Sequence, residues 1–414
     1  MHIRDVVKND LCISCGLCAL SSNVDWPNYF IKGRLSPKIV NSHIIEDRIE
    51  NSCPGKGYPI QLLSSDLFSR ANNITHHDLL GYYNEIFGLR SKNKDYLKFA
   101  SSGAVIPTII EYTLKNNIVD AILTSEMTYS EHGPIALPIW ITDFKMVTKN
   151  VQGSKYMPVP LLSDLEKGFD LYKRIAVVGT PCQIAALRTY LKEVDCVTQK
   201  KLIFTMSNFC GGFRDFRESE RIVSTFRFKL KDLTDFRFRG NGHPGFMSIE
   251  DDSRKVNLPY PDYSGLTGVH KMKRCKLCVD ATGELSDLSF GDAWLPHLKG
   301  EGFSIVMSRS EFGQILIRDM VKQGCFEFVN VSRDEVLASQ RGNLETKKIR
   351  QRSRNFLYRI LLKRIPKFDG GFRNEKLNIF FELKVVLSQI IKPYFVKYKL
   401  LKKIKKLNHE KFEK

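Results

Sequence analysis

The sequence predicts a mixed α/β fold (α+β mixed), with a cysteine-rich segment before it and a basic helical tail after it. Between about residues 166 and 340, short apolar runs alternate with helical patterns, which is typical of α/β structure. Three closely spaced cysteines stand near the N-terminus, and lysines dominate the C-terminal end. We therefore divide the chain into four stretches, 1–75, 76–165, 166–340 and 341–414.

Length and composition indicate a protein with a sizeable core. The chain has 414 residues, of which 43% are hydrophobic, so more than one domain is expected. Neither an apolar leader nor a run of eighteen apolar residues is visible, so we expect no secretory signal and no membrane span. Ten cysteines in such a chain favour metal ligation in a reducing cytoplasm over a disulfide scaffold.

The net charge of +19 is concentrated at one end of the chain. From Arg341 to Lys414 there are 22 Lys and Arg against 6 Asp and Glu, a net charge of +16, which leaves only +3 for the preceding 340 residues. The body also lacks a helix-turn-helix, zinc-finger or RNP-type pattern. The sequence therefore predicts no nucleic-acid partner.

The first stretch carries Cys12, Cys15 and Cys18, with two residues in each gap. This spacing is typical of ferredoxin-type [4Fe–4S] sites, in which a fourth cysteine is usually followed by proline. Ser22 occupies the nearby fourth position, so we expect Cys53, which precedes a proline, to complete the set. A zinc knuckle is the alternative, but structural zinc usually takes its cysteines as separated pairs.

The second stretch predicts a helix followed by a strand. After the turn at 101–103, an apolar stripe at helical spacing includes Val105, Ile109 and Ile110. The run 119–123 then has the composition of a strand.

The third stretch begins with a clear strand-to-helix turn. The apolar run 175–178 predicts a buried strand, and Gly179 permits a tight turn after it. Thr180 is a good N-cap and Pro181 suits the first helical position. Cys182 then falls in the first helical turn, where the helix dipole and free N–H groups favour a thiolate.

Four cysteines of this stretch predict a second [4Fe–4S] site. They are Cys182, Cys210, Cys275 and Cys278. Cys210 follows another strand-like run, 202–206, and ligands gather at the C-terminal ends of parallel strands. Taken singly, Cys182 or Cys210 could be an inert buried thiol, and Cys275 with Cys278 could be half of a zinc knuckle. Cys196 and Cys325 belong to neither set.

The tail predicts a basic amphipathic helix. Ile379, Leu383, Val386 and Ile390 share one helical face, and after Pro393 apolar residues alternate with lysines. Such a helix can lie on an anionic membrane. A solvated helix packed on the body is the alternative.

Together these motifs resemble the beta subunit family of coenzyme F420 hydrogenases and dehydrogenases. This family includes 7-hydroxymethyl chlorophyll a reductase and homologues found with polysaccharide biosynthesis genes. The matching blocks run in the expected order, at 12–18, 53–55, 101–103, 152–156, 179–183, 210–212, 238–242, 275–280 and 289–294. The chain departs from the family pattern at Ala104 and Gly211, where glycine and histidine are usual.

The resemblance implies an oxidoreductase that passes electrons through two [4Fe–4S] clusters and FAD. It implies an N-terminal ferredoxin-like iron–sulfur segment over residues 1–75. A flavin-binding α/β core follows, made of the family's N-terminal-type domain over 76–165 and its C-terminal-type domain over 166–340. The cluster of Cys182 would be the one nearest the flavin. The residues expected on the flavin side are Ser101, Ser102, Gly103, Lys155, Tyr156, Gly179, Thr180, Asp292 and Trp294.

Lys155 is the candidate catalytic residue, because it could hydrogen-bond the reduced flavin or its substrate. From the residues alone, Lys155 could instead be a solvated charge, Asp292 a structural hydrogen-bond partner and Trp294 a core aromatic.

The resemblance also implies partners. Electrons would come from ferredoxin, another one-electron carrier or reduced coenzyme F420, and go to a small organic acceptor, with a role in polysaccharide biosynthesis as one setting. A non-catalytic electron-carrier subunit of a larger redox complex is the alternative function, and a zinc protein is a more distant one. We expect a cytoplasmic protein whose tail contacts the inner membrane face or a membrane-bound partner. The sequence does not decide whether the chain forms a homo-oligomer.

Overall fold

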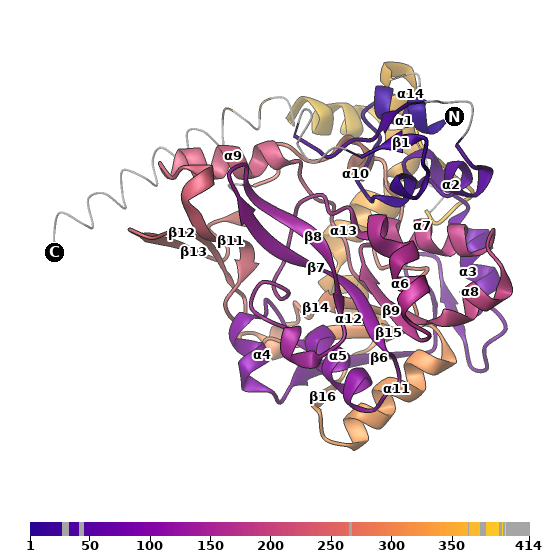
Figure 1. The fold of residues 1–414 in the computed structure, drawn as a ribbon, viewed down its shortest axis with the longest axis vertical. Coiled ribbons are helices and arrows are strands. Elements are labelled where there is room, and N and C mark those ends of the chain that lie inside the picture. The colour runs from indigo at the N-terminus through magenta and orange to yellow at the C-terminus, as the bar shows by residue number, and fades with distance from the viewer. Residues whose placement is uncertain are drawn as a thin grey trace.

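The computed structural model describes residues 1–26, 33–40, 45–264, 267–362, 364–372 and 378–388, and also residues 391 and 394. At its centre lies an eight-stranded mixed sheet with the strand order β16-β6-β15-β14-β10-β9-β7-β8 (Figure 1). Its strands are β6 (Glu85–Ser91), β7 (Ala121–Ser130), β8 (Gly133–Ile141), β9 (Ile175–Gly179), β10 (Leu202–Asn208), β14 (Leu288–Asp292), β15 (Ser304–Ser308) and β16 (Phe326–Asn330). The predicted mixed α/β fold is confirmed.

The middle of this sheet is parallel. β14, β10, β9 and β7 run in the same direction, while β15, β6, β16 and β8 pair antiparallel with their neighbours. Helices α7 (Pro181–Leu191) and α8 (Cys196–Lys201) connect β9 to β10, which is the crossover that parallel neighbours require. The C-terminal ends of β9 and β10 therefore lie at one edge of the sheet, as predicted for the segments that carry Cys182 and Cys210.

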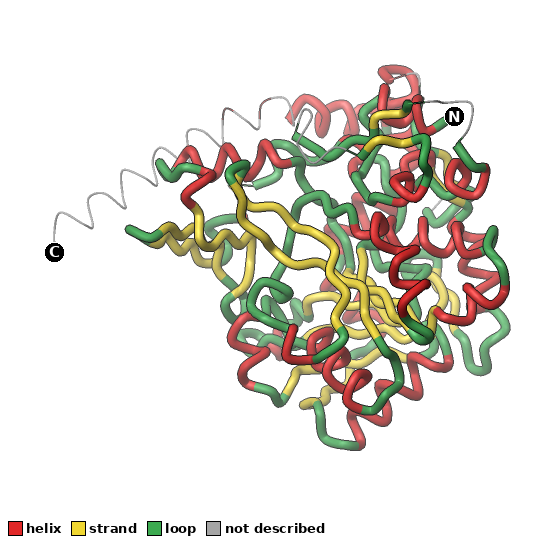
Figure 2. Tube along the Cα trace, viewed as in Figure 1, coloured by secondary structure: helices red, strands yellow, loops and turns green. Residues whose placement is uncertain are grey.

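Helices cover both faces of the sheet (Figure 2), so its central strands are apolar on both sides. On β7, Ile122 packs in a cluster with residues of α4 (Lys94–Phe99), α5 (Val105–Lys115) and α11 (Glu311–Lys322). Ala121 and Leu123 face the opposite way, toward α3 (Ile60–Phe68), α6 (Leu165–Leu171) and α7. The helix predicted after residue 103 is α5, and the strand predicted at 119–123 is the start of β7.

A smaller unit is built around the far end of the β7–β8 hairpin (Figure 1). Its antiparallel sheet consists of β11 (Leu233–Gly240), β12 (Phe246–Asp251) and β13 (Lys255–Pro259). Met127 of β7 and Ala136 of β8 join one apolar cluster with this sheet and with α9 (Phe216–Thr225).

Short elements from both ends of the chain meet beside the main sheet. β3 (Gly57–Tyr58) pairs in parallel with β17 (Lys367–Phe368), and the Asp369 carboxylate accepts hydrogen bonds from the N–H groups of Gln61 and Leu62 at 3.0 and 2.9 Å. The remaining elements are α1 (Ile3–Lys8), β1 (Val24–Asp25), β2 (Lys38–Ile39), α2 (Asp47–Asn51), β4 (Thr75–His77), β5 (Gly81–Tyr83), α10 (Lys273–Lys276), α12 (Arg333–Ser339), α13 (Arg341–Leu344) and α14 (Gln351–Leu362).

The beginning of the basic stretch packs into the body. A π-helical turn, Glu345–Ile349, links α13 to α14, and its Lys347 and Lys348 are buried, as is Gln351. In the described part of the chain, no helix combines the length and the apolar character that crossing a bilayer would need.

Residues 379–388 are helical, as the sequence predicts, but Glu382 stands inside the expected apolar stripe. Glu382 is buried and pairs with Arg354 at 3.2 Å and Arg350 at 3.4 Å. Ile379 and Val386 are half-buried, and Leu383 is exposed. Ile390 and the lysine-rich residues 395–414 lie outside the described residues.

Candidate functional site

The four N-terminal cysteines line one cavity. Cys12, Cys15, Cys18 and Cys53 surround it together with apolar side chains of α1 and α2. Gly16 has a left-handed φ of 87°, and a Cβ at this position would stand 2.7 Å from the carbonyl oxygen of Pro160. Glycine is therefore needed for the cysteine loop to lie this close to the neighbouring turn.

These thiols are held where a bare thiolate is unfavourable. Burial raises the pKa of all four, for Cys53 to about 12, and the neighbouring cysteines add to the effect on Cys15 and Cys18. Backbone N–H groups oppose this, since Ser14 N–H donates to Cys12 Sγ at 3.4 Å and the N–H groups of Leu17 and Gly55 act on Cys15 and Cys53. A bound cation such as iron would supply the missing positive charge.

The second set forms where three parts of the chain converge. Cys182 stands in the first turn of α7, which Thr180 and Gln183 cap, and the Thr180 hydroxyl lies 3.4 Å from Cys182 Sγ. Cys210 follows β10 and accepts the N–H of Gly212 at 3.3 Å.

The four cysteines of this set lie close enough to affect one another's ionisation. Burial raises the pKa of Cys182, and the charges of Cys278, Cys275 and Cys210 raise it further. Burial alone would also raise the pKa of Cys278, but the Lys347 and Arg274 cations outweigh it and lower that pKa. Cations that stabilise thiolates are what a thiolate-ligated cluster needs.

The two cysteine sets are neighbours. Cys182 contributes to the raised pKa of Cys15, and both side chains belong to one packed cluster. Arg274, which precedes Cys275, donates from Nε to the carbonyl oxygen of Pro54, which follows Cys53, at 2.9 Å.

No site for a single metal ion is formed among the described residues. Among the residues the structure describes, no three His, Cys, Asp or Glu side chains could hold one metal ion. A single zinc would draw its sulfur ligands to within ~4 Å of one another, because each lies about 2.3 Å from the metal. Four thiols around one cavity are the donor set that a [4Fe–4S] cluster requires, so the N-terminal residues fit the predicted cluster.

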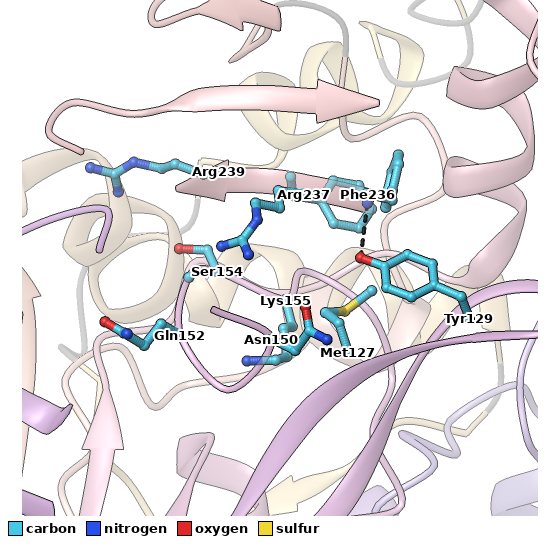
Figure 3. Close-up of a pocket in the computed structure, with 11 residues that line it drawn as sticks. Met127, Tyr129, Asn150, Gln152, Ser154, Lys155, Phe236, Arg237 and Arg239 are labelled. Carbon is cyan, nitrogen blue, oxygen red and sulfur yellow. Dashed lines mark hydrogen bonds between the residues drawn. The ribbon is translucent and has the colours of Figure 1, made fainter. Parts of the chain in front are cut away.

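A separate polar pocket lies between β11 and the loop at 150–155 (Figure 3). In Figure 3 the Arg237 guanidinium points from β11 toward the loop that carries Ser154 and Lys155, whereas Arg239 points to one side. The pocket is lined by Met127, Tyr129, Asn150, Gln152, Gly153, Ser154, Lys155, Phe236, Arg237, Phe238 and Arg239.

Lys155 is not a solvated charge. Its Nζ donates to the carbonyl oxygen of Val151 at 2.6 Å. Burial of the ammonium, with a further contribution from the Arg237 cation, lowers the pKa of Lys155 to about 7. Lys155 can therefore gain or lose a proton near neutral pH, as an acid–base group requires.

Among the described residues, three buried polar atoms on the pocket wall lack a hydrogen-bond partner. They are Asn150 Oδ1, Gln152 Oε1 and Arg237 Nη1. Such atoms are costly to bury unless something else satisfies them. The donors and acceptors of a polar heterocycle such as a flavin would satisfy these atoms, and so would ordered water.

Arg239 joins several predicted flavin-side residues. Its Nη2 donates to the carbonyl oxygen of Ser101 at 2.6 Å, its Nη1 pairs with Asp292 at 2.5 Å, and its guanidinium lies 5.2 Å from the Trp294 ring centre. Trp294 is 38% exposed and stacks on Tyr260, so it is a rim residue, not a core aromatic.

The 101–103 turn is tied to β15. Ser102 Oγ donates to the Phe303 carbonyl oxygen at 2.9 Å, and Gly103 N–H donates to Ser304 Oγ at 2.9 Å. A Cβ on Gly103 would stand 2.3 Å from the Leu89 carbonyl oxygen. The next residue, Ala104, has a left-handed φ of 52°, a conformation that the usual glycine would adopt with less strain.

The structure thus distributes the predicted flavin residues over two places. Of these residues, Lys155 lines the pocket directly, and Ser101 reaches its wall through a 3.2 Å contact with Ser154. Gly179 and Thr180 instead lie in the turn before Cys182, beside the second cysteine set.

Tyr156 and Arg214 connect the pocket to the second cysteine set. Tyr156 follows Lys155, and its carbonyl oxygen accepts the N–H of Arg214 at 3.0 Å. The Arg214 guanidinium lies 5.2 Å from the Tyr156 ring centre and donates to the carbonyl oxygen of Gly212 at 3.0 Å. Gly212 in turn lies against Cys275.

Sequence reasoning missed four cations of this region. Arg237 and Arg239 lie in or beside the block 238–242, and Arg274 directly precedes a cysteine, so each had a motif beside it. Lys347 had no such signal, because it lies in the stretch interpreted as tail.

Comparison with known proteins gives two family matches, both to the beta subunit of coenzyme F420 hydrogenase/dehydrogenase. The model of the N-terminal part of that subunit matches residues 86–166, and the model of its C-terminal part matches residues 172–334. These matches contain the pocket and the second cysteine set, and both end before Lys347.

Similar proteins carry related names. Coenzyme F420 hydrogenase subunit beta of Methanococcus voltae is 28% identical over 256 residues, which cover 61% of this chain and 86% of the relative. An F420H2 dehydrogenase subunit from Methanosarcina mazei is 23% identical over 332 residues, which cover 77% and 85%. A chain of the F420-reducing [NiFe] hydrogenase complex from Methanosarcina barkeri has the same fold, with a TM-score of 0.56 at 19% identity, over 71% of this chain and 98% of that chain.

Proposed function

We propose, starting from the fact that this chain belongs to the coenzyme F420 hydrogenase/dehydrogenase beta subunit family, that it is an iron–sulfur flavoprotein. Members of this family are subunits of oxidoreductases, so this chain takes part in a redox reaction. The further proposal is that Cys12, Cys15, Cys18 and Cys53 hold one [4Fe–4S] cluster, that Cys182, Cys210, Cys275 and Cys278 hold a second, and that FAD binds at the Lys155 pocket.

One observation carries this proposal. Two four-cysteine sets lie side by side, and the second is linked to the pocket through Gly212, Arg214 and Tyr156. Such an order suits electrons that enter at the N-terminal set and leave at the pocket.

The pocket residues have distinct roles in the proposal. When bound, FAD exchanges single electrons with clusters and two electrons with an organic molecule. Lys155, the candidate catalytic residue, holds or releases a proton at Nζ near neutral pH, while Arg237 offers an unpaired N–H to an acceptor atom. Arg239 fixes the Ser101 turn and Asp292 around the pocket.

Relatives named for coenzyme F420 support this coenzyme as a redox partner. We propose that a ferredoxin-like carrier or reduced coenzyme F420 supplies electrons to a small organic acceptor, with polysaccharide biosynthesis as one setting. Since relatives are subunits of hydrogenase or dehydrogenase complexes, this chain is proposed to work with partner subunits. A non-catalytic carrier subunit is the second candidate, favoured by those same subunit names.

Cofactor analysis of protein purified without oxygen tests the function. We expect about eight iron and eight sulfide per chain, together with FAD released on denaturation. The variant Cys15→Ala should leave about half of the iron. A value near four that Cys15→Ala does not change would remove the N-terminal cluster. Full iron content without flavin would favour the carrier subunit, and a colourless zinc protein would refute both.

The basic end of the chain is proposed to dock a cytoplasmic protein on the inner membrane face. Exposed apolar side chains occur on α14 and on the helix at 379–388, among them Phe356, Ile360, Phe380 and Leu387. Lys347, Lys348 and Arg354 are buried in the body, so the charge offered to anionic lipid is chiefly that of the nine lysines after Ser388.

A further inference from the structure

Two adjacent lysines of the π-helical turn are buried in different charge environments. Lys348 pairs with the Glu284 carboxylate, so its charge is neutralised locally. Lys347 is only 2% exposed, and within the described part of the chain its Nζ donates to a carbonyl oxygen, that of Asp280, at 2.6 Å.

The same carbonyl oxygen ties Lys347 to the second cysteine set. Cys278 Sγ lies 3.7 Å from the Asp280 oxygen that Lys347 Nζ contacts, so the ammonium and the sulfur are separated by at most the sum of these distances. The Asp280 carboxylate is engaged elsewhere, because its Oδ1 accepts the N–H of Gly283 at 2.8 Å.

Burying a lysine without a carboxylate partner is unfavourable unless other negative charge lies nearby. Thiolates that ligate a cluster would supply such charge beside Lys347 Nζ, together with the Asp280 carboxylate.

We infer that Lys347 is a positioning residue whose fixed positive charge raises the reduction potential of the cluster held by Cys182, Cys210, Cys275 and Cys278. This inference rests on the proposed function, because it requires a cluster at that set. Reduction adds negative charge to the cluster, and a buried cation beside it stabilises the reduced form. Lys347 lies beyond the residues that the family models match.

The test is a redox titration, followed by electron paramagnetic resonance, of the full-length protein loaded with its cofactors. Lys347→Gln keeps a hydrogen-bond donor but removes the charge, and should lower the midpoint potential of the second cluster. Lys347→Arg keeps the charge and should hold the potential near that of the wild type. The double variant Glu284→Gln with Lys348→Met removes an equally buried but neutralised pair, and should not shift the potential.

The outcomes separate this inference from the proposed function. A wild-type protein without cluster signals would refute the clusters themselves. Normal signals with an unshifted potential in Lys347→Gln would overturn only the role of Lys347. If Lys347→Gln loses the second cluster while Lys347→Arg keeps it, the charge is required; loss in both variants would mean that Lys347 merely fills space, and would overturn the inference.

Discussion

Arg274 and Pro54 lie 220 positions apart in the sequence, yet the Arg274 Nε–H donates to the Pro54 carbonyl oxygen at 2.9 Å. Pro54 follows one proposed cluster ligand and Arg274 precedes another. Their hydrogen bond therefore fixes the spacing between the two cysteine sets, on which electron passage between them would depend.

We expect Arg274→Met to weaken both sets. The change leaves the buried Pro54 carbonyl without this partner, at a cost of about 1–3 kcal/mol, and removes a cation that favours the Cys278 thiolate. Arg274→Lys keeps the positive charge but loses the planar guanidinium and its several N–H donors. It should therefore retain more iron than Arg274→Met. Iron content and thermal unfolding measure the effect, and equal losses in the two variants would contradict the role of the charge.

Cys182→Ser should damage flavin reduction more than Cys15→Ser when an artificial reductant supplies electrons. Serine is a weaker iron ligand than a thiolate, so each change should weaken the binding of the cluster that its own cysteine set holds. Cys182 belongs to the set linked to the pocket, whereas Cys15 belongs to the more distant one. Stopped-flow bleaching of the flavin measures the difference; equal rates would argue against an ordered chain of cofactors.

Ligand binding at the pocket should depend on pH through Lys155. With a pKa of about 7, Lys155 is an ammonium below neutral pH and a neutral amine above it. An anionic ligand favours the ammonium, so the affinity for FAD should fall as the pH rises above about 7, by at most about tenfold per pH unit. Flavin fluorescence quenching at pH 6 to 9 measures this, with Lys155→Met as the control. The same slope in Lys155→Met would exclude Lys155 as its source.

The same lysine makes folding stability depend on pH. In the unfolded chain Lys155 keeps its proton up to its ordinary pKa of 10.5, whereas in the folded chain it loses the proton near 7. Between these values the unfolded state binds more protons, so the contribution of Lys155 to stability rises with pH. Below pH 7 both states are protonated and the cost of burying the ammonium is felt in full.

Truncation after Ser388 should strongly weaken sedimentation with anionic liposomes while leaving iron and flavin in place. It removes nine lysines but keeps Glu382, which pairs with the buried Arg354. Each lysine near such a surface contributes about 1 kcal/mol, and salt weakens the attraction. Failure of the full-length protein to bind at low salt would rule out direct lipid docking. Truncation after Gly371 is the contrasting variant, since loss of Glu382 should cost about 3–5 kcal/mol of stability.

Local signals explain which parts could be predicted from the sequence. The strand before Gly179 and the helix start at Thr180 and Pro181 depend on neighbouring residues, and β9 and α7 confirm both. The spacing of the cysteines likewise predicts that they gather in two sets, although what they ligate stays a prediction.

The roles of Arg239 and Lys347 could not be predicted, because their hydrogen-bond partners are distant in sequence. The Arg239 guanidinium finds Ser101 across 138 positions, and Lys347 finds Asp280 across 67. No periodicity marks either residue, because each depends on how separate elements pack. Lys347 also lies in a strongly basic stretch, where one more lysine carries no signal of burial.

The pairing of β17 with β3 sets an order on synthesis of this protein. Asp369 caps the start of α3 from 308 positions away, and β17 closes over Gly57, so the ribosome releases these residues long after Cys12 and Cys53. Throughout most of translation the start of α3 is therefore without its cap and β3 is without its partner strand. The first part of the chain to be synthesised reaches its final packing only after residue 369 has emerged from the ribosome.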